Sequence, residues 1–429
     1  MNEIKLTPNS KPLSGVIEVP GDKSISHRAV ILGSLAKGTT KVTHFLDGED
    51  CMRTVHAFQA MGVSIERSDS TLLIEGRGIS GLNEPTVPLY FGNSGTTGRL
   101  MLGLLAGLPF FTTVYGDESL SKRPMDRVVD PLRLMGASFD GRGHGSYLPL
   151  SIRGENLKGI DYTLPVKSAQ VKSAILLAGL VADGETQVTE KTNTRDHTEN
   201  MLQAFGADII SNENNTTITS KKELSATDVY VPGDISSAAF FLVAAAIVPN
   251  SVITLKNVGL NVTRTGIIDV LTEMGASIQV TNQRTLSGEL FGDIHVKYSN
   301  LHGITIEGEI IPRLIDEIPI IALLATQASG ATVIRNAEEL RVKETDRIAA
   351  VVDVLSTLGA SVEATDDGMI IHGKTSLKGG AVSSYNDHRI AMMAAISSLV
   401  ATEEVILDDK DCISISYPTF FADLHDVMS

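Results

Sequence analysis

Apolar and polar positions alternate along this chain in a pattern that repeats about every 70 residues. One part of the repeat is typical of an amphipathic helix that ends in glycine and is followed by β-branched residues. Glycine suits the left-handed residue that closes a helix, and β-branched residues favour a strand. The pattern recurs as AFQAMGVSIE, LRLMGASFD, LQAFGADII, LTEMGASIQ and LSTLGASVE, with the helix ends at Gly62, Gly136, Gly206, Gly275 and Gly359.

A second series, in step with the first, consists of helices that are apolar nearly all round and follow a short polar turn. A helix without a polar face is typical of a buried one. Each repeat therefore predicts one buried helix, one surface helix and several strands, which is an α/β fold. The six polar turns begin at Gly21, Gly92, Lys167, Gly233, Ile315 and Asn386.

The counts of the two series differ, because six buried helices accompany only five glycine-ended ones. We therefore expect the last repeat to be split across the termini, with FFADLHDVM as its surface helix and the N-terminal LSGVIEVP as its missing strands. VPGDKS at Val19 is echoed by VPGDIS at Val231, which suggests two chain crossings in a two-stranded hinge. This predicts an N-terminal domain at 20–232 and a C-terminal domain at 1–19 plus 233–429, with three repeats each. A chance echo of turn residues is the alternative, and the shared phase of the two series disfavours it.

Composition narrows the classes of function. The 429 residues carry a formal net charge of −15 and no long run of Lys or Arg, which argues against nucleic acid as a partner. The longest apolar stretch, from Ala238 to Val248, is too short to cross a membrane, and the first residues do not resemble a secretory signal. Only Cys51 and Cys412 occur, so we expect a cytoplasmic protein without a structural zinc site.

Polar residues gather at the starts of the buried helices. Helix N-termini offer unpaired N–H groups and a partial positive charge, so several that converge can bind an anion without a net positive chain. Each residue alone also fits a helix cap or a solvated charge; the recurrence at one phase of the repeat favours a shared site. The candidates are Lys23, Ser24, Arg28, Asn93, Gly95, Arg123, Ser168, Gln170, Arg195, Asp316, Lys343, Glu344, Arg347, His388 and Arg389. We expect Lys343 and Arg347, four residues apart, to share one helical face.

Six segments, spread over residues 13–420, resemble the 5-enolpyruvylshikimate-3-phosphate synthase family: GDKSISHR, GNSGTTGR, SKRP, SAQVKSA, RVKETDR and NDHRIAM. Ala169 and Arg195 stand where many members have Ser and Tyr, which is similar to the second class of the family. The resemblance implies two inside-out α/β barrel domains, each of three βαβαββ units. It also implies transfer of the enolpyruvyl group of phosphoenolpyruvate to the 5-hydroxyl of shikimate 3-phosphate, through a tetrahedral ketal, without metal or organic cofactor.

The resemblance also assigns roles to residues. Asp316 would accept the 5-hydroxyl proton, Glu344 would donate the proton to C3, and Lys23 would touch both substrates, with His388 near the same centre. Lys23, Gly95, Arg123 and Gln170 would hold the phosphate of phosphoenolpyruvate, and Arg347 and Arg389 its carboxylate. Asn93 is a further expected substrate-binding residue. The shikimate carboxylate would bind Ser24 and Arg28, and its phosphate and hydroxyls would bind Ser168, Ala169, Arg195 and Lys343.

Two other functions compete with this interpretation. The sibling family that transfers enolpyruvyl to UDP-N-acetylglucosamine shares the architecture, but it uses a loop cysteine where this chain has GDESLSKRP. A non-catalytic anion-binding relative would have no reason to keep Asp316, Glu344, Lys23 and His388 together. We therefore expect a monomeric enzyme of aromatic amino acid biosynthesis with two small-molecule substrates and no nucleic-acid or membrane partner.

Overall fold

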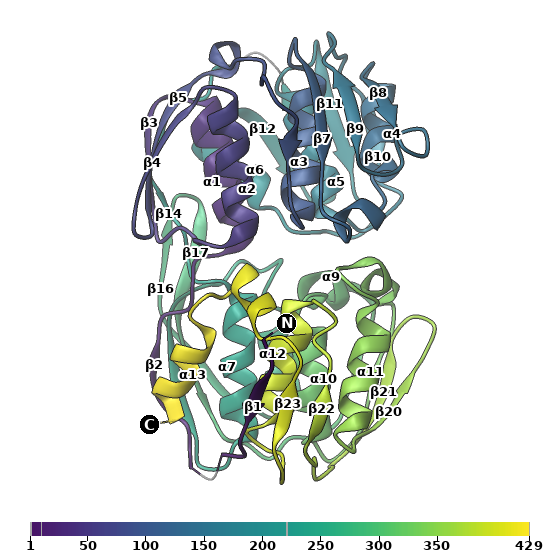
Figure 1. The fold of residues 1–429 in the computed structure, drawn as a ribbon. Helices are drawn as coiled ribbons and strands as arrows, with labels where there is room; N and C mark the ends of the chain where they lie inside the picture. The colour runs from purple at the N-terminus through teal and green to yellow at the C-terminus, as the bar shows by residue number, and fades with distance from the viewer. Residues whose placement is uncertain (1, 10, 220–221, 429) are drawn as a thin grey trace. The chain divides into compact units, whose positions relative to one another are not determined.

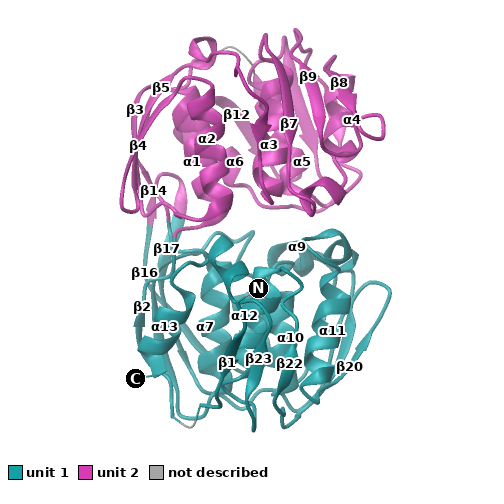
Figure 2. Cartoon of the chain, in the orientation of Figure 1, with its two compact units in different colours: residues 1–20, 232–284, 290–429 teal, residues 21–231, 285–289 magenta. Residues whose placement is uncertain are grey.

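The computed structural model describes residues 2–9, 11–219 and 222–428. The chain forms two compact units (Figure 2). Unit 1 comprises Met1–Pro20, Pro232–Arg284 and Leu290–Ser429, and unit 2 comprises Gly21–Val231 and Thr285–Glu289. The short segment 285–289 falls inside the range assigned above to the C-terminal domain. It groups with unit 2 because the Ser287 hydroxyl donates to Asp228 O at 3.0 Å and Glu289 Oε1 lies 2.8 Å from His197 Nδ1.

Unit 2 is built from three repeats, each with a four-stranded sheet (Figure 1). The first repeat contains α1 (Lys23–Leu35), β3 (Lys37–Thr43), α2 (Glu49–Ala60), β4 (Ser64–Ser68), β5 (Thr71–Arg77) and β14 (Val229–Tyr230). The second contains β6 (Leu89–Tyr90), α3 (Gly95–Ala106), β7 (Phe111–Tyr115), α4 (Asp126–Leu134), β8 (Ser138–Gly141) and β9 (Leu150–Arg153). The third contains β10 (Asp161–Thr163), α5 (Ala169–Gly179), β11 (Glu185–Thr189), α6 (His197–Ala204), β12 (Asp208–Asn212) and β13 (Asn215–Thr219).

Unit 1 repeats the plan with two four-stranded sheets and one three-stranded sheet. Its first repeat contains β2 (Ser14–Ile17), α7 (Ile235–Ile247), β15 (Val252–Gly259), α8 (Gly266–Glu273), β16 (Ser277–Leu286) and β17 (Glu289–Lys297). The second contains β18 (Thr305–Ile306), α9 (Ile311–Leu314), α10 (Ile318–Thr326), β19 (Gly330–Ile334), α11 (Arg347–Thr357), β20 (Ser361–Ala364) and β21 (Met369–Gly373). The third contains β22 (Gly380–Val382), α12 (His388–Ser397), β23 (Val405–Leu407), α13 (Phe420–Met428) and β1 (Ile4–Leu6). Short 3₁₀ turns lie at Ile79–Gly81, Leu120–Lys122, Gly308–Ile310, Glu338–Val342 and Asp411–Ile415.

The apolar helices form the core of each unit, and the sheets cover them. In α7 every residue from Ile235 to Ile247 is buried, and α10 is buried from Ile318 to Thr326. This confirms that the helices without a polar face are internal. The five predicted helix-ending glycines all adopt left-handed φ angles, between +84° at Gly206 and +100° at Gly136, which confirms their role as helix closers.

A strand from the N-terminal part of the chain joins the last sheet, but the strand expected there was wrong. The last repeat takes up β1, whose Ile4 pairs antiparallel with Leu407 of β23. The segment LSGVIEVP supplies β2 instead, which runs parallel to β15 with Ser14 opposite Val252. In unit 2 the equivalent strand is β14, parallel to β3. Each crossing strand thus completes the first sheet of one unit and precedes the first buried helix of the other, which explains the VPGD echo.

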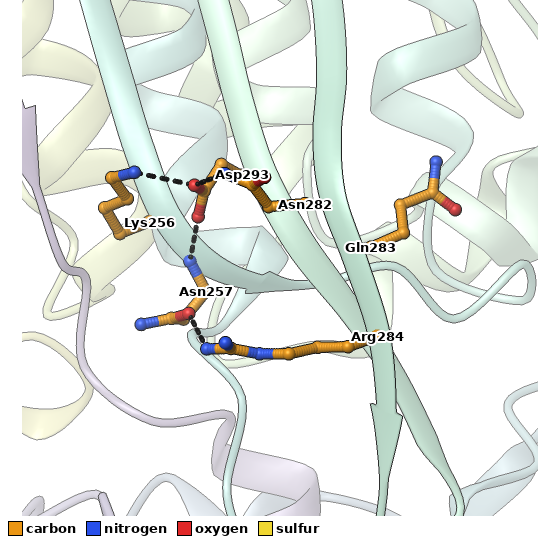
Figure 3. A pocket seen from close by; sticks show the side chains of 6 residues that line it. All are labelled: Lys256, Asn257, Asn282, Gln283, Arg284 and Asp293. Carbon is orange, nitrogen blue, oxygen red and sulfur yellow. Dashed lines mark hydrogen bonds and ion pairs between the residues drawn. The ribbon is translucent and has the colours of Figure 1, made fainter.

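A buried carboxylate fixes an irregularity of β15. The strand's register with β17 shifts between Leu255 and Val258, and Asn257 there has a φ of +53°. Asp293, only 4% exposed, accepts hydrogen bonds from Lys256 Nζ at 2.7 Å, Asn282 Nδ2 at 2.8 Å and Asn257 N at 3.1 Å (Figure 3). Asn257 O in turn accepts from Gly233 N at 2.8 Å, so the bulge also anchors the chain just after its second crossing.

These contacts predict an acid-sensitive contribution to stability. Burial alone would raise the pKa of Asp293, but the hydrogen bonds from Lys256, Asn282 and Asn257 lower it to about 2. The unfolded value lies near 4, so the contribution is complete above about pH 4 and is lost as the pH falls toward 2. We expect Asp293→Asn to destabilise the protein by about 1.5–3 kcal/mol at pH 7, as for hydrogen bonds to a charged group.

The measurement is urea denaturation of the parent and the variant at several pH values. The difference should shrink as the pH falls from 4 to 2. Glu307→Gln, which removes the exposed partner of Arg335 in the same unit, is the control and should have little effect at any pH. A difference for Asp293→Asn that is absent at pH 7, or unchanged at pH 2, would contradict the assignment.

Candidate functional site

In unit 2 the start of α1 carries Lys23, as predicted. Asp22 caps the helix by accepting from Ile25 N at 2.9 Å, which leaves Lys23 in the first turn. Its Nζ atom lies 3.0 Å from Asp50 Oδ2, and both side chains are largely buried. Asp50, in the first turn of α2, was not among the predicted site residues. An acidic residue at a helix start is common, so the sequence offered no signal that this one holds Lys23.

Ser24 and Arg28 are brought together as the spacing predicted. Arg28 is 5% exposed and donates to Ser24 O at 2.9 Å, Thr198 Oγ1 at 2.6 Å and Ser173 Oγ at 2.8 Å. Burial lowers the pKa of Arg28 to about 10, so it stays charged at neutral pH. These contacts use three of the five guanidinium N–H bonds and leave two that can bind a carboxylate.

The start of α3 is surrounded by donors. Ser94 caps the helix, and Arg123 donates to Asn93 O at 3.3 Å and to Ser119 Oγ at 3.2 Å. A methyl group added at Gly95 would lie 3.1 Å from Arg99 and 3.2 Å from Arg123. Two guanidinium groups therefore flank a backbone turn without a side chain, at a helix N-terminus, which is an arrangement that binds anions.

Gln170 joins this group from the start of α5. Its amide nitrogen donates to Thr96 Oγ1 at 3.0 Å, and its amide oxygen accepts from Arg99 at 2.5 Å. Arg99 and Thr96 were not predicted as site residues, although both stand in the quoted GNSGTTGR segment. The structure thus brings Gly95, Arg123 and Gln170 together, and Asn93 joins them through its contact with Arg123.

The remaining unit 2 candidates lie at the starts of α5 and α6. Ser168 caps α5 by accepting from Val171 N at 3.4 Å, and Ala169 is the first residue of that helix. Arg195 lies just before α6, and its positive charge is one of the influences that lower the pKa of Arg28.

A buried ion cluster supports these two helix starts. Lys172, 2% exposed, lies 2.7 Å from both Glu190 Oε2 and Glu199 Oε1. Burial by itself would lower the pKa of Lys172, but the two carboxylates raise it. Thr194, which directly precedes Arg195, donates a hydrogen bond from its hydroxyl to Glu190. Lys172 was missed because a lysine in an apolar helix is usually read as a chance surface position.

In unit 1 the centre of the site is Arg347, which is 1% exposed and contacts three carboxylates. Its Nε atom lies 2.7 Å from Asp387, NH2 lies 2.7 Å from Glu344, and NH1 lies 3.2 Å from Asp316. Burial alone would lower the pKa of Arg347, but Asp387, Glu344 and Asp316 raise it. The candidate acid and the candidate base therefore share one fixed cation.

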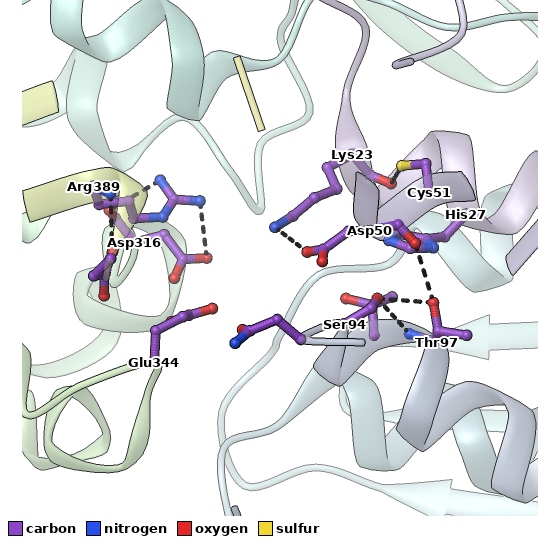
Figure 4. Close-up of polar contacts among 12 residues, drawn as sticks. Lys23, His27, Asp50, Cys51, Ser94, Thr97, Asp316, Glu344 and Arg389 are labelled. Carbon is purple, nitrogen blue, oxygen red and sulfur yellow. Dashed lines mark hydrogen bonds and ion pairs between the residues drawn. The ribbon is translucent and has the colours of Figure 1, made fainter. Parts of the chain in front are cut away.

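Two further cations lie around Asp316. Lys343 Nζ is 3.6 Å from Asp316 Oδ1, and Arg389 NH1 donates to Asp316 O at 3.1 Å (Figure 4). His388 is buried at the first position of α12, where Asp387 caps the helix by accepting from Arg389 N at 2.9 Å. The structure thus brings together Asp316, Lys343, Glu344, Arg347 and Arg389, and His388 is the neighbour of Arg389 in α12.

One geometric expectation for this segment was wrong. Lys343 and Arg347 do not share a helical face, because the chain is extended at Lys343 and α11 begins only at Arg347. Asp346 causes the break: its carboxylate accepts from Ala349 N at 3.1 Å and so caps a helix that starts one residue later. Lys343 and Arg347 still meet at Asp316, because the turn between them folds back.

Within the described residues, no cluster of three or more His, Cys, Asp or Glu side chains could hold a metal ion. Over the same part of the chain, no helix has the length and apolar character needed to cross a bilayer.

Comparison with known proteins points to one family. The family model for EPSP synthase (3-phosphoshikimate 1-carboxyvinyltransferase) matches residues 8–424. The 3-phosphoshikimate 1-carboxyvinyltransferase of Oceanobacillus iheyensis is 63% identical over 428 residues and covers all of both chains. That of Bacillus subtilis is 57% identical over 414 residues, 96% of this chain and 97% of its own.

Solved structures give the same answer for the fold. An EPSP synthase structure from Acinetobacter baumannii superposes with a TM-score of 0.89 at 46% identity, over 99% of this chain and 98% of that one. The match extends over both units and over every segment that carries a candidate residue. The chain therefore belongs to the EPSP synthase family.

Proposed function

We propose that this chain transfers the enolpyruvyl group of phosphoenolpyruvate to the 5-hydroxyl of shikimate 3-phosphate and releases phosphate. The hydroxyl oxygen bonds to C2 of phosphoenolpyruvate while C3 gains a proton and the hydroxyl loses one. The resulting ketal then loses phosphate from C2 and a proton from C3, which restores the double bond. The observation that carries the proposal is the Asp316–Arg347–Glu344 cluster, where a base and an acid are held by one buried cation.

The acid and base roles follow from this cluster. Asp316 accepts the hydroxyl proton and Glu344 supplies the C3 proton, as positioned carboxyl groups do in general acid–base catalysis. Arg347 and Arg389 take the carboxylate of phosphoenolpyruvate, for which a guanidinium is suited. Arg347 already directs four of its five N–H bonds to three carboxylates, so a ligand carboxylate can bind it with two hydrogen bonds only when one of these turns away. Arg389, which donates to a backbone oxygen, has more freedom to bind the ligand.

Unit 2 supplies donors for the two phosphates. Lys23, Asn93, Gly95, Arg123 and Gln170 hold the phosphate of phosphoenolpyruvate at the start of α3. The shikimate carboxylate binds Ser24 and the two remaining N–H bonds of Arg28. Its 3-phosphate and hydroxyls bind Ser168, the Ala169 backbone, Arg195 and Lys343, and His388 lies close to the reacting carbon.

We also propose that the protein acts as a monomer in the cytoplasm. All residues assigned to both substrates come from one chain, so no second copy is needed to complete a site.

The chemistry needs charged groups and a dry pocket rather than a metal, and the assigned residues supply these charges.

The transferase assignment is tested by phosphate release. Phosphate should appear only when phosphoenolpyruvate and shikimate 3-phosphate are both present, with one phosphate per enolpyruvyl group transferred. UDP-N-acetylglucosamine in place of shikimate 3-phosphate should give none. Turnover with the UDP-sugar alone would favour the sibling activity, and no turnover with either acceptor would favour a non-catalytic relative.

The base is tested by Asp316→Asn, which keeps the shape of the side chain but removes its ability to take a proton. We expect kcat to fall by about 10²–10⁴-fold, while the Kd for shikimate 3-phosphate changes little. Asp366→Asn, on the exposed turn between β20 and β21, is the control and should match the parent. If Asp316→Asn keeps more than about a tenth of the parent kcat, another group is the base.

The cysteines separate this mechanism from that of the sibling. Cys51 is 0% exposed, and burial raises the pKa of Cys412 to about 12, so neither suits a reactive thiolate. We expect the double variant Cys51→Ser, Cys412→Ser to keep near-parental kcat with shikimate 3-phosphate. The epoxide that alkylates the sibling's loop thiol should leave the parent active. A folded but inactive double variant, or stoichiometric inactivation by the epoxide, would refute the mechanism.

A further inference from the structure

The N-terminal halves of α1, α2 and α3 in unit 2 are joined by a row of buried side-chain hydrogen bonds. His27 Nδ1 lies 2.7 Å from Thr54 Oγ1, which lies 2.8 Å from Thr97 Oγ1, which lies 2.8 Å from Ser94 Oγ. All four side chains are 0% exposed. We call this row the hydroxyl chain; Figure 4 labels three of its members.

The hydroxyl chain ends at the groups assigned to phosphate binding. Ser94 accepts from Thr97 N at 3.1 Å and caps α3, between Asn93 and the turn at Gly95. Thr97 also donates to Asp50 O at 3.4 Å, and the Asp50 side chain holds Lys23. Thr97 therefore contacts both the cap of one anion-binding helix and the residue that orients the lysine of another.

Stability alone does not call for this arrangement. Valine has the shape of threonine and needs no partner, whereas a buried hydroxyl costs free energy unless it is hydrogen-bonded. We therefore attribute to these four buried polar side chains a role in fixing the relative positions of the helices that carry them. His27 also stays neutral, because burial and the charges of Lys23 and Arg28 hold its pKa well below the usual value. It can thus end the chain without adding a third cation beside these two.

We propose that the hydroxyl chain positions the phosphate site of phosphoenolpyruvate, with Thr97 as its central positioning residue. It holds the start of α3 against the start of α1, so that Lys23 and the turn at Asn93–Gly95 can bind the same phosphate. Ser94, Thr97, Thr54 and His27 act through these groups and touch no substrate. The inference rests on the proposed function, which assigns that phosphate to the start of α3.

The test compares steady-state constants for both substrates. Thr97→Val removes the hydroxyl at nearly constant volume, so we expect the KM for phosphoenolpyruvate to rise about tenfold, as for a lost hydrogen bond with misplacement of the site. The KM for shikimate 3-phosphate should change by less than about twofold. Of its proposed ligands, Arg28 on α1 is held by Thr198 and Ser173, outside the hydroxyl chain, and those at the starts of α5 and α6 lie on helices that carry no member of that chain. Thr97→Ser keeps the hydroxyl and should restore the parent value. Thr54→Val interrupts the hydroxyl chain at the next member and should also raise the KM for phosphoenolpyruvate more than that for shikimate 3-phosphate. This second variant keeps the test possible if Thr97→Val fails to fold.

The matched control is Thr112→Val on β7. Thr112 is 3% exposed and its hydroxyl has no hydrogen-bond partner within the described residues, so the same substitution removes no contact there. It should leave both KM values unchanged. An equal rise in both KM values for Thr97→Val and Thr54→Val, or a loss of thermal stability with an unchanged KM for phosphoenolpyruvate, would overturn the proposal.

Arg123→Gln separates this inference from the proposed function. If it raises the KM for phosphoenolpyruvate and Thr97→Val and Thr54→Val do not, the phosphate assignment stands and the hydroxyl chain has no positioning role. If Arg123→Gln leaves that KM unchanged, the phosphate does not bind at the start of α3, and both the assignment and the inference fail.

Discussion

A helix that is apolar on every side can be buried, but its first N–H groups still need partners, and this constraint decides where the chemistry of the protein lies. Along α1, α3, α5, α7 and α12 the capping oxygens come from Asp22, Ser94, Ser168, Asp234 and Asp387. Cations and hydroxyls gather at the same ends, since the remaining turns are packed against apolar neighbours. Each unit therefore gathers several of its buried charged side chains near these helix starts.

Burial of charge imposes the second condition, because an unpaired ion inside a protein is far more costly than a paired one. Arg347 meets it with three carboxylates, and Lys172 with two. The two clusters differ in what they leave available. Lys172 is enclosed and serves the position of α5 and α6, whereas the partners of Arg347 include Asp316 and Glu344, the residues proposed as base and acid.

The local signals in the sequence were sufficient for much of this structure. The glycine at each helix end and the apolar helices follow from short-range preferences, and both were predicted correctly. The strand that completes the last repeat was not, because the pairing of Ile4 with Leu407 joins segments at opposite ends of the chain and no short pattern records it. Thr54 and Asp50 were missed for the same reason: their contacts with Thr97 and Lys23 link different helices. Lys343 was wrongly placed on the same helix as Arg347, because their spacing of four residues fits a helix. The spacing does not show that Asp346 caps the helix and so makes it begin after Lys343.

The net charge of −15 and two anionic substrates pose one remaining question, which is how cations stay available for ligands. In unit 1 four carboxylates, Asp316, Glu317, Glu344 and Asp387, lie around Lys343, Arg347 and Arg389. Under the proposed function, a ligand carboxylate that binds Arg389 and Arg347 competes with Asp316 for the same N–H groups. The carboxylate that it displaces loses part of its cationic partner and so becomes a stronger base. Under the same proposal, binding of phosphoenolpyruvate would prepare Asp316 to accept the hydroxyl proton, and a carboxylate that is paired with cations in the free protein would take part in the reaction once the ligand has bound.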